Sequence, residues 1–376
     1  MARDGFKVMD SDMHVIEPAD LWQRYIDPAF RDHAPVGISG HPRDLGVTLN
    51  GQPLTGGPRN PYAEAGAAQE RLDQTPQYRD ADEHGFDSGS QVRAMDLEAI
   101  DVAVLFPTRA LFTANIDGMD PHLGDAIVRA YNDWMYDFCK DHPGRLYGAG
   151  GLSPHDVEMA VMEVRRCVEE LEFKAMFLKP VLHNKRNWYD PYYDPIWAEC
   201  QRLGVPVGFH DGARSPLASP EVQMGGHFDS TMLQHASGWH AMQMMMAATA
   251  FCAGGILERF PDLKVAFLEG NCAWVPWLMW RLDEHQEWRG YEAPDLKMKP
   301  SEYFKRQCYV SIECDEEPAK YVDALGYGHT VVYSTDYPHP DSKFPHATDN
   351  FFRLDLPDDV RRKYLWENCA RLYGFE

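Results

Sequence analysis

Eight short apolar runs alternate with helical patterns along most of the chain, and this alternation is the feature that most constrains the fold. Each run is rich in β-branched and aromatic residues and ends at polar residues, Gly or Pro, which is typical of buried strands. The predicted strands span residues 6–12, 102–106, 146–151, 175–179, 205–210, 264–269, 308–313 and 330–335. The predicted helices span residues 90–100, 121–142, 156–171, 193–203, 240–260, 274–287 and 318–325, followed by a C-terminal set within 349–373.

Eight such units predict an α/β protein built as one (β/α)8 TIM barrel over residues 1–376, with a doubly wound open sheet as the alternative. No Gly-x-Gly-x-x-Gly follows any of the runs, so nothing indicates a dinucleotide site. Two insertions interrupt the alternation. Residues 15–89 contain a hairpin signal at 47–54, centred on Asn50-Gly51, and residues 211–239 are long enough to cover a catalytic rim as a lid.

Charge and composition narrow the class of partner. The 376-residue chain carries a formal net charge of −22, which opposes binding to nucleic acid or to an anionic membrane. It has neither a run of about 18 apolar residues nor an N-terminal apolar signal. The eight cysteines form no Cys-x-x-Cys pair and are expected to be reduced. We therefore expect a cytoplasmic protein whose partner is a small molecule.

Four polar residues stand at or near the ends of three predicted strands. Asp12 and His14 close the first run, His210 ends the fifth, and Asp336 follows the eighth just before Pro338. Side chains two apart on a strand share a face, and in a closed barrel the first strand lies beside the eighth. The four would then meet at one rim as a mixed nitrogen and oxygen site suited to Zn²⁺, Mn²⁺ or Fe²⁺. Taken singly, Asp12 as a cap and His210 as a core residue remain alternatives.

The same motifs resemble a known family. Asp-x-His at residues 12–14, the stretches 206–210 and 255–276, Arg281-Leu282-Asp283 and Ser334-Thr-Asp-Tyr-Pro-His together resemble the amidohydrolase-related branch of the amidohydrolase superfamily. That branch holds the aminocarboxymuconate semialdehyde decarboxylase-like enzymes. The resemblance spans residues 7–373. It implies a metal-dependent (β/α)8 enzyme acting on small organic acids, with Asp12, His14, His210 and Asp336 in the positions of the metal ligands.

The chain also departs from that pattern. Glu269 ends the sixth run where decarboxylases of the branch have a histidine. Three roles remain open for Glu269: a catalytic base, a ligand of a second metal, or a structural carboxylate. His240 resembles a first-turn histidine of the branch, with a cap or a lid contact as its alternative. Trp274 is a candidate wall of the substrate pocket, although an aromatic at a helix start is more often part of the core.

Three functional hypotheses follow. The first is a metal-dependent hydrolase or decarboxylase in which Asp336, His240 and Glu269 are the catalytic acid/base groups. The second is a non-haem oxygenase with two iron ions, or iron and manganese, in which His240 and Glu269 bind the second metal. The third is a partner subunit without chemistry of its own. We also expect a homo-oligomer, with a hetero-oligomer containing a paralogous subunit as the alternative.

Overall fold

A computed structural model describes residues 3–37, 46–54, 76–113, 116–210, 233, 240–339 and 342–375. Its centre is one sheet of eight parallel strands whose spatial order follows the chain. The strands are β1 (Met9–His14), β5 (Val102–Phe106), β6 (Leu146–Gly151), β7 (Ala175–Leu178), β8 (Val207–Phe209), β9 (Val265–Phe267), β10 (Cys308–Ile312) and β11 (Val331–Tyr333). Sequential parallel order confirms the predicted (β/α)8 barrel and excludes the doubly wound alternative, which needs a reversal of strand order.

The barrel closes where β1 meets the end of β11. The His14 amide donates to the Tyr337 carbonyl (2.7 Å), and Asp10 accepts hydrogen bonds from the amide and hydroxyl of Thr335. A bulge in β1 between Asp10 and Met13 is held by the Asp12 amide, which donates to the Asp10 side chain (3.1 Å). The closure brings the first and last strands together, as the sequence predicts.

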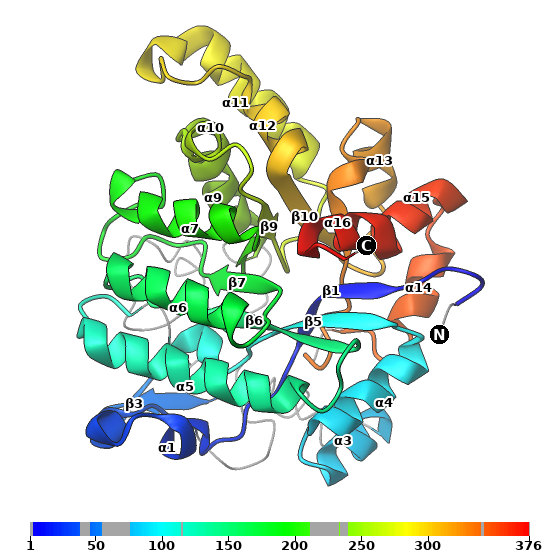
Figure 1. Cartoon of the computed structure of the whole chain (residues 1–376). Helices are drawn as coiled ribbons and strands as arrows, with labels where there is room; N and C mark the ends of the chain where they lie inside the picture. The colour runs from blue at the N-terminus through cyan, green and yellow to red at the C-terminus, as the bar shows by residue number, and fades with distance from the viewer. Residues whose placement is uncertain are drawn as a thin grey trace.

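Helices surround the strands (Figure 1). The longer ones are α4 (Ser88–Glu98), α5 (Pro121–Cys139), α6 (Val157–Glu169), α7 (Asp194–Leu203), α9 (Ala241–Ala253), α11 (Val275–Arg289) and α12 (Pro300–Gln307). The shorter ones are α1 (Leu21–Tyr25), α3 (Arg79–Glu83), α10 (Ile256–Arg259), α13 (Ala319–Ala324), α14 (Ala347–Arg353), α15 (Asp358–Arg362) and α16 (Asn368–Tyr373), with a π-helical turn at Lys363–Glu367. No described helix is both long and apolar enough to cross a membrane.

Local signals in the sequence place the helix ends. Asp120 caps α5 by accepting from the His122 and Leu123 amides, and Asp156 caps α6 in the same way through the Met159 amide. Gly204 ends α7 with a φ of +67°, a conformation that favours glycine. The caps explain why these helices begin and end close to the predicted positions.

A small antiparallel sheet lies in the first insertion. It consists of β2 (Val36–Gly37), β3 (Val47–Leu49) and β4 (Gln52–Pro53). Asn50 and Gly51 form its turn with φ values of +50° and +73°, so the predicted hairpin is confirmed. The predicted lid, residues 211–239, lies outside the described residues except for Leu233.

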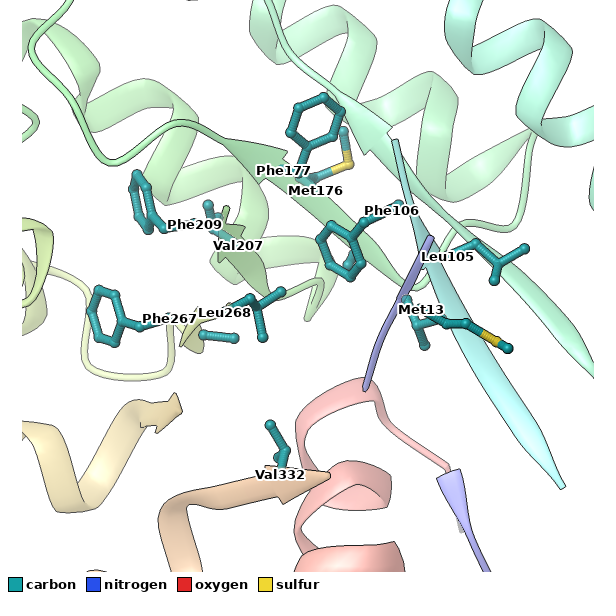
Figure 2. Close-up of a cluster of buried hydrophobic side chains, with 14 of the residues drawn as sticks. Met13, Leu105, Phe106, Met176, Phe177, Val207, Phe209, Phe267, Leu268 and Val332 are labelled. Atoms are coloured by element: carbon teal, nitrogen blue, oxygen red, sulfur yellow. The ribbon is translucent and has the colours of Figure 1, made fainter. Parts of the chain in front are cut away.

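The barrel interior is apolar below the rim. Phe106, Leu268 and Val332 point into it, whereas Phe209 and Phe267 point outward to the helices (Figure 2). The Phe106 ring lies under the rim, with its centroid 6.0 Å from that of His210 and 6.5 Å from that of His14. The floor of the polar rim is therefore built from the same packed side chains that hold the strands together.

Several predicted boundaries are wrong by a few residues. The first strand runs from Met9 to His14 instead of residues 6–12, and the predicted helix 240–260 is two helices, α9 and α10, separated by Gly254 and Gly255. Gly255 adopts a φ of +85°, which interrupts the helix. Helix α12 was not predicted because its eight residues are mostly polar.

We predict that Gly208→Ala in β8 destabilises the barrel. An added Cβ would lie 2.9 Å from Phe106 Cε1 and 3.2 Å from Leu268 Cδ1, and both side chains are buried. Overpacking of this kind costs about 1–3 kcal/mol, which chemical denaturation will measure. The control is Gly290→Ala, whose Cβ would come no closer than 3.8 Å to Gln286. Equal stability of the two variants would contradict the packing described here.

Candidate metal centre

Asp12 and His14 converge from β1, the first strand of the barrel. Both side chains are fully buried, and Asp12 Oδ1 lies 3.6 Å from His14 Nε2. His14 Nδ1 lies 2.8 Å from the Pro107 carbonyl oxygen. A carbonyl oxygen only accepts, so Nδ1 carries the proton and Nε2 presents a lone pair to the rim. The orientation of His14 is thus set before any ligand binds.

His210 meets this pair from the end of β8. Its Nε2 lies 2.9 Å from His14 Nε2 and 3.5 Å from Asp12 Oδ1. Two nitrogens bound to one ion at about 2.1 Å and at right angles lie about 3 Å apart, which matches the separation of the two imidazoles. Asp12, His14 and His210 are therefore arranged as three ligands of one ion.

Asp336 approaches from the other side of the seam. Its Oδ1 lies 3.4 Å from His14 Nε2, and its backbone φ is +58°. His339, in the same loop, lies beside it: the distance from His339 Nδ1 to Asp336 Oδ1 is 2.8 Å. The predicted ligand set gave no role to His339. Its only sequence signal was its place in the Ser-Thr-Asp-Tyr-Pro-His motif, because contact with Asp336 depends on the fold of the turn.

Glu269 and His240 extend the cluster past β9. Glu269 Oε2 lies 3.2 Å from His210 Nε2, and its Oε1 lies 3.3 Å from His240 Nδ1. Glu269 and His240 have φ values of +50° and +46°. A positive φ costs energy for residues other than Gly and is often found at functional sites. Asp336 also has a positive φ, so the three residues share this conformation.

The electrostatics of Asp12 and His14, the two β1 residues, fit a cation. Neither oxygen of Asp12 has a hydrogen-bond partner of normal geometry among the described residues. Burial and the carboxylates of Asp336, Asp10 and Glu313 raise the pKa of Asp12 well above its usual value; the Glu269 backbone opposes this only weakly. Burial, with the neighbouring His339 and His210, lowers the pKa of His14, which keeps it in the neutral form that binds metals. A buried carboxylate with so little hydrogen bonding is expensive unless an ion compensates it.

Two further buried carboxylates, neither of them predicted, hold the rim in place. Glu17 accepts hydrogen bonds from three successive amides, those of Thr108, Arg109 and Ala110, and so ties the segment after β1 to the loop after β5. Asp10 ties β1 to Thr335, the residue before Asp336, and burial raises its pKa to about 6. No sequence pattern distinguishes these two acids from other acids in strands or loops.

The structure does not bring Trp274 into this cluster. Its ring packs edge-on against Phe267 and Phe304 in the helix layer, and its indole N–H donates to the Gly270 carbonyl (2.9 Å). These contacts correspond to the core alternative considered for Trp274. Among the described residues, no contact supports a role of Trp274 in substrate binding.

We predict that His14→Ala and His210→Ala each remove most of the bound metal. Even residues that only orient metal ligands typically contribute 10–100-fold in affinity, so losing a ligand should leave less than about a tenth of the wild-type metal content. Elemental analysis of protein purified without chelator will measure this. The control is the exposed His122, whose change to Ala should leave the metal content unaltered. Full metal content in either rim variant would contradict the proposed convergence.

Sequence comparisons give relatives that are decarboxylases. Gamma-resorcylate decarboxylase from Polaromonas sp. (strain JS666) is 27% identical over 295 residues, which cover 75% of this chain and 86% of the relative. The 2-amino-3-carboxymuconate-6-semialdehyde decarboxylase of Dictyostelium discoideum is 27% identical over 275 residues, 70% of each chain.

Solved structures share the fold. An amidohydrolase from Mycobacterium avium subsp. paratuberculosis K-10 superposes with a TM-score of 0.77 at 20% identity, covering 99% of this chain and 98% of the other. A dihydroxybenzoic acid decarboxylase from Polaromonas sp. JS666 was solved with manganese and the inhibitor 2-nitroresorcinol. It superposes with a TM-score of 0.66 at 19% identity, covering 98% of this chain and 97% of the other. The amidohydrolase family itself matches residues 9–375, nearly the whole chain, and the protein therefore belongs to the amidohydrolase family.

Proposed function

We propose that this protein is a metal-dependent decarboxylase of a small aromatic or unsaturated carboxylic acid. The observation that carries the proposal is the buried convergence of Asp12, His14, His210 and Asp336 at the C-terminal rim of the barrel. The two relatives described above support the reaction class, because both are decarboxylases. Of the hypotheses drawn from the sequence, they favour the hydrolase or decarboxylase.

Asp12, His14 and His210 would hold the ion, with Asp336 completing the set. The manganese in the Polaromonas structure supports Mn²⁺, and the nitrogen and oxygen donors also suit Zn²⁺. A bound divalent ion would supply Lewis-acid polarisation of a substrate oxygen or of a bound water. The protein's part is to keep His14 neutral, which burial does by lowering its pKa, and to orient its ring, which the Pro107 carbonyl does.

Decarboxylation needs a proton on the carbon that loses CO2. The bond from that carbon to the carboxylate breaks, the electron pair stays on the carbon, and a proton is added there. Asp336 is placed to hold this proton because its carboxylate lies at the edge of the ligand cluster, beside His14 and His339. Glu269 and His240 form a second acid/base pair, 3.3 Å apart, and Glu269 also lies 3.2 Å from His210. The proposed catalytic groups are therefore Asp336, with Glu269 and His240.

An anionic substrate must overcome the net charge of −22. Two cationic side chains that follow barrel strands support a local attraction for an anionic substrate. Lys179 follows β7 and lies 5.9 Å from the Phe112 ring centroid, and Arg109 follows β5; both are buried. Both residues stand after the carboxyl ends of barrel strands, the edge that also carries the ligand cluster. The Arg109 guanidinium also donates to the Gly46 carbonyl (3.0 Å) and acts on the buried Glu17 carboxylate.

The oxygenase alternative needs ligands for a second metal. Two groups of three residues in the described part of the chain have ligand atoms within 4.8 Å of one another, and neither includes Glu269 or His240. We therefore favour one ion. About one Mn or Zn per chain supports decarboxylation or hydrolysis, whereas two Fe, or Fe with Mn, would support oxygenation. A chain without metal would favour the non-catalytic partner subunit.

We predict that the manganese-loaded protein releases CO2 from gamma-resorcylate or a related hydroxybenzoate. Asp336→Asn should lower kcat by at least about 10²-fold, because a positioned proton donor contributes 10²–10⁴-fold. The assay follows loss of substrate absorbance together with CO2. Asp315→Asn is the matched control, since this exposed acid pairs with Lys343. Unchanged turnover in Asp336→Asn would overturn the assignment, and inactivity of the wild type on all aromatic acids would overturn the substrate class.

We also propose that the protein is a cytoplasmic homo-oligomer. Trp277 and Trp280 on α11 are 55% and 56% exposed, and with Tyr321 and Leu325 they border a groove of about 630 Å³ between α11 and α13. Large exposed aromatics are typical of interfaces. Sedimentation velocity is expected to give a species heavier than the 42.9 kDa chain. A monomer at micromolar concentration would contradict this, and a second polypeptide purified with the chain would indicate a hetero-oligomer.

A further inference from the structure

We propose that Glu316 is a positioning residue for Glu269, one of the catalytic groups proposed above, and that the indole of Trp274 assists it. Both residues act on the loop of residues 269–273, which follows β9 and carries Glu269. The inference rests on the proposed function, because it takes the acid/base role of Glu269 from there. It adds two residues from outside the proposed set of metal ligands and acid/base groups.

The backbone of this loop depends on contacts from its surroundings. Glu269 and Asn271 have φ values of +50° and +59°, a conformation that costs energy for residues other than Gly. Between them, Gly270 leaves no room for a side chain, because a Cβ there would lie 2.7 Å from Met244 Cγ on α9. A loop released from its contacts would leave this conformation and turn the Glu269 side chain away from its present direction.

Glu316 holds the far end of the loop. Its carboxylate is buried and accepts hydrogen bonds from the amides of Cys272 (3.0 Å) and Ala273 (2.9 Å). The Glu316 amide in turn donates to the carbonyl of Glu313 (3.0 Å), the residue directly after β10. Since β10 pairs with β9, Glu316 ties the loop after β9 to the end of the neighbouring strand.

Trp274 holds the middle of the loop. Its indole N–H donates to the carbonyl of Gly270 (2.9 Å), the residue directly after Glu269. The indole ring is anchored by edge-on packing against Phe267 and Phe304. Trp274 therefore acts on the site through the backbone of Gly270, and this role needs no contact with a substrate.

The two contacts preserve the position of the Glu269 carboxylate. Its Oε2 lies 3.2 Å from His210 Nε2, and its Oε1 lies 3.3 Å from His240 Nδ1. His240 Nδ1 also lies 2.9 Å from the Glu269 carbonyl oxygen, so the backbone and the side chain of Glu269 meet the same imidazole. Misplacing a catalytic group by about 1 Å can cost about 10²-fold in rate. Loosening the loop should therefore lower kcat through Glu269.

A double-mutant cycle on kcat tests whether Glu316 acts through Glu269. Glu316→Ala should lower kcat by about 10–100-fold when Glu269 is present. In a Glu269→Gln background the same change should alter kcat by less than about twofold, because the group that Glu316 positions is already lost. Glu316→Gln keeps a carbonyl oxygen that can accept from both amides, and it should retain kcat within about threefold.

Trp274→Phe is a second variant, which keeps an aromatic ring in the helix layer and removes the indole N–H. It should lower kcat by about 3–10-fold, the usual worth of one hydrogen bond, and only when Glu269 is present. The control is Asp120→Ala, which removes a carboxylate that accepts from the amides of His122 and Leu123 at the start of α5. This control should leave kcat unchanged in both backgrounds.

Amide hydrogen exchange of the full-length protein tests the loop without turnover. Peptides that cover residues 268–274 should exchange faster in Glu316→Ala than in the wild type, and at the wild-type rate in Asp120→Ala. Wild-type exchange in Glu316→Ala would overturn the proposal, because the loop would then be held without Glu316. Thermal denaturation identifies unfolded variants, and Trp274→Phe replaces Glu316→Ala in the cycle if Glu316→Ala does not fold.

The two measurements separate the inference from the function on which it rests. An equal loss of kcat with and without Glu269 would overturn the positioning role, because Glu316 would then act on the structure in general. If the wild type releases no CO2 from any aromatic acid, the proposed function fails and the catalytic part of the inference fails with it. Faster exchange in Glu316→Ala would still support the hold of Glu316 on the loop.

Discussion

The seam between β1 and β11 is the contact on which the site depends. Closing the barrel places the ends of the first and last strands side by side, so that residues more than 300 positions apart share one rim. The seam is held by backbone pairing of His14 with Tyr337 and by the buried Asp10 carboxylate, which binds Thr335. If this contact opened, Asp336 would leave His14, and Asp10 would lose the hydrogen bonds from Thr335 that offset its burial.

Building the site costs folding energy. It buries two imidazoles with their ring nitrogens 2.9 Å apart, and it raises the pKa of Asp12 through burial of the carboxylate and through the other acids around it. Asp336, Glu269 and His240 all have a positive backbone φ. The surrounding barrel supplies the compensation: Phe106 and Leu268 pack beneath the rim, while Glu17 satisfies three amides at its edge. Such concentrated strain is typical of sites arranged for a ligand in advance.

Structural features that arise from a repeating residue pattern or from a local sequence signal could be predicted from the sequence. The eight-fold alternation predicted the barrel, and Asn50-Gly51 predicted the hairpin in the first insertion. The convergence of Asp12, His14, His210 and Asp336 followed from the rule that parallel strands end at one rim. Glu17 and Asp10 were missed because hydrogen bonding across the barrel, which has no periodic signature, defines their roles. The contact of His339 with Asp336 was missed because it depends on the fold of the turn. The mostly polar helix α12 was missed for lack of an apolar pattern.

The sequence by itself determined the architecture, the family and four candidate ligands, since hydrophobic periodicity and strand-end chemistry depend on neighbouring residues. Only the tertiary structure decided which nitrogen of His14 faces the rim, that Glu269 stands between His210 and His240, and that Trp274 packs in the helix layer. The physical reason is that these facts concern single side-chain orientations. Orientation is set by contacts between strands and loops that are distant in the chain, and such contacts exist only once the barrel has closed.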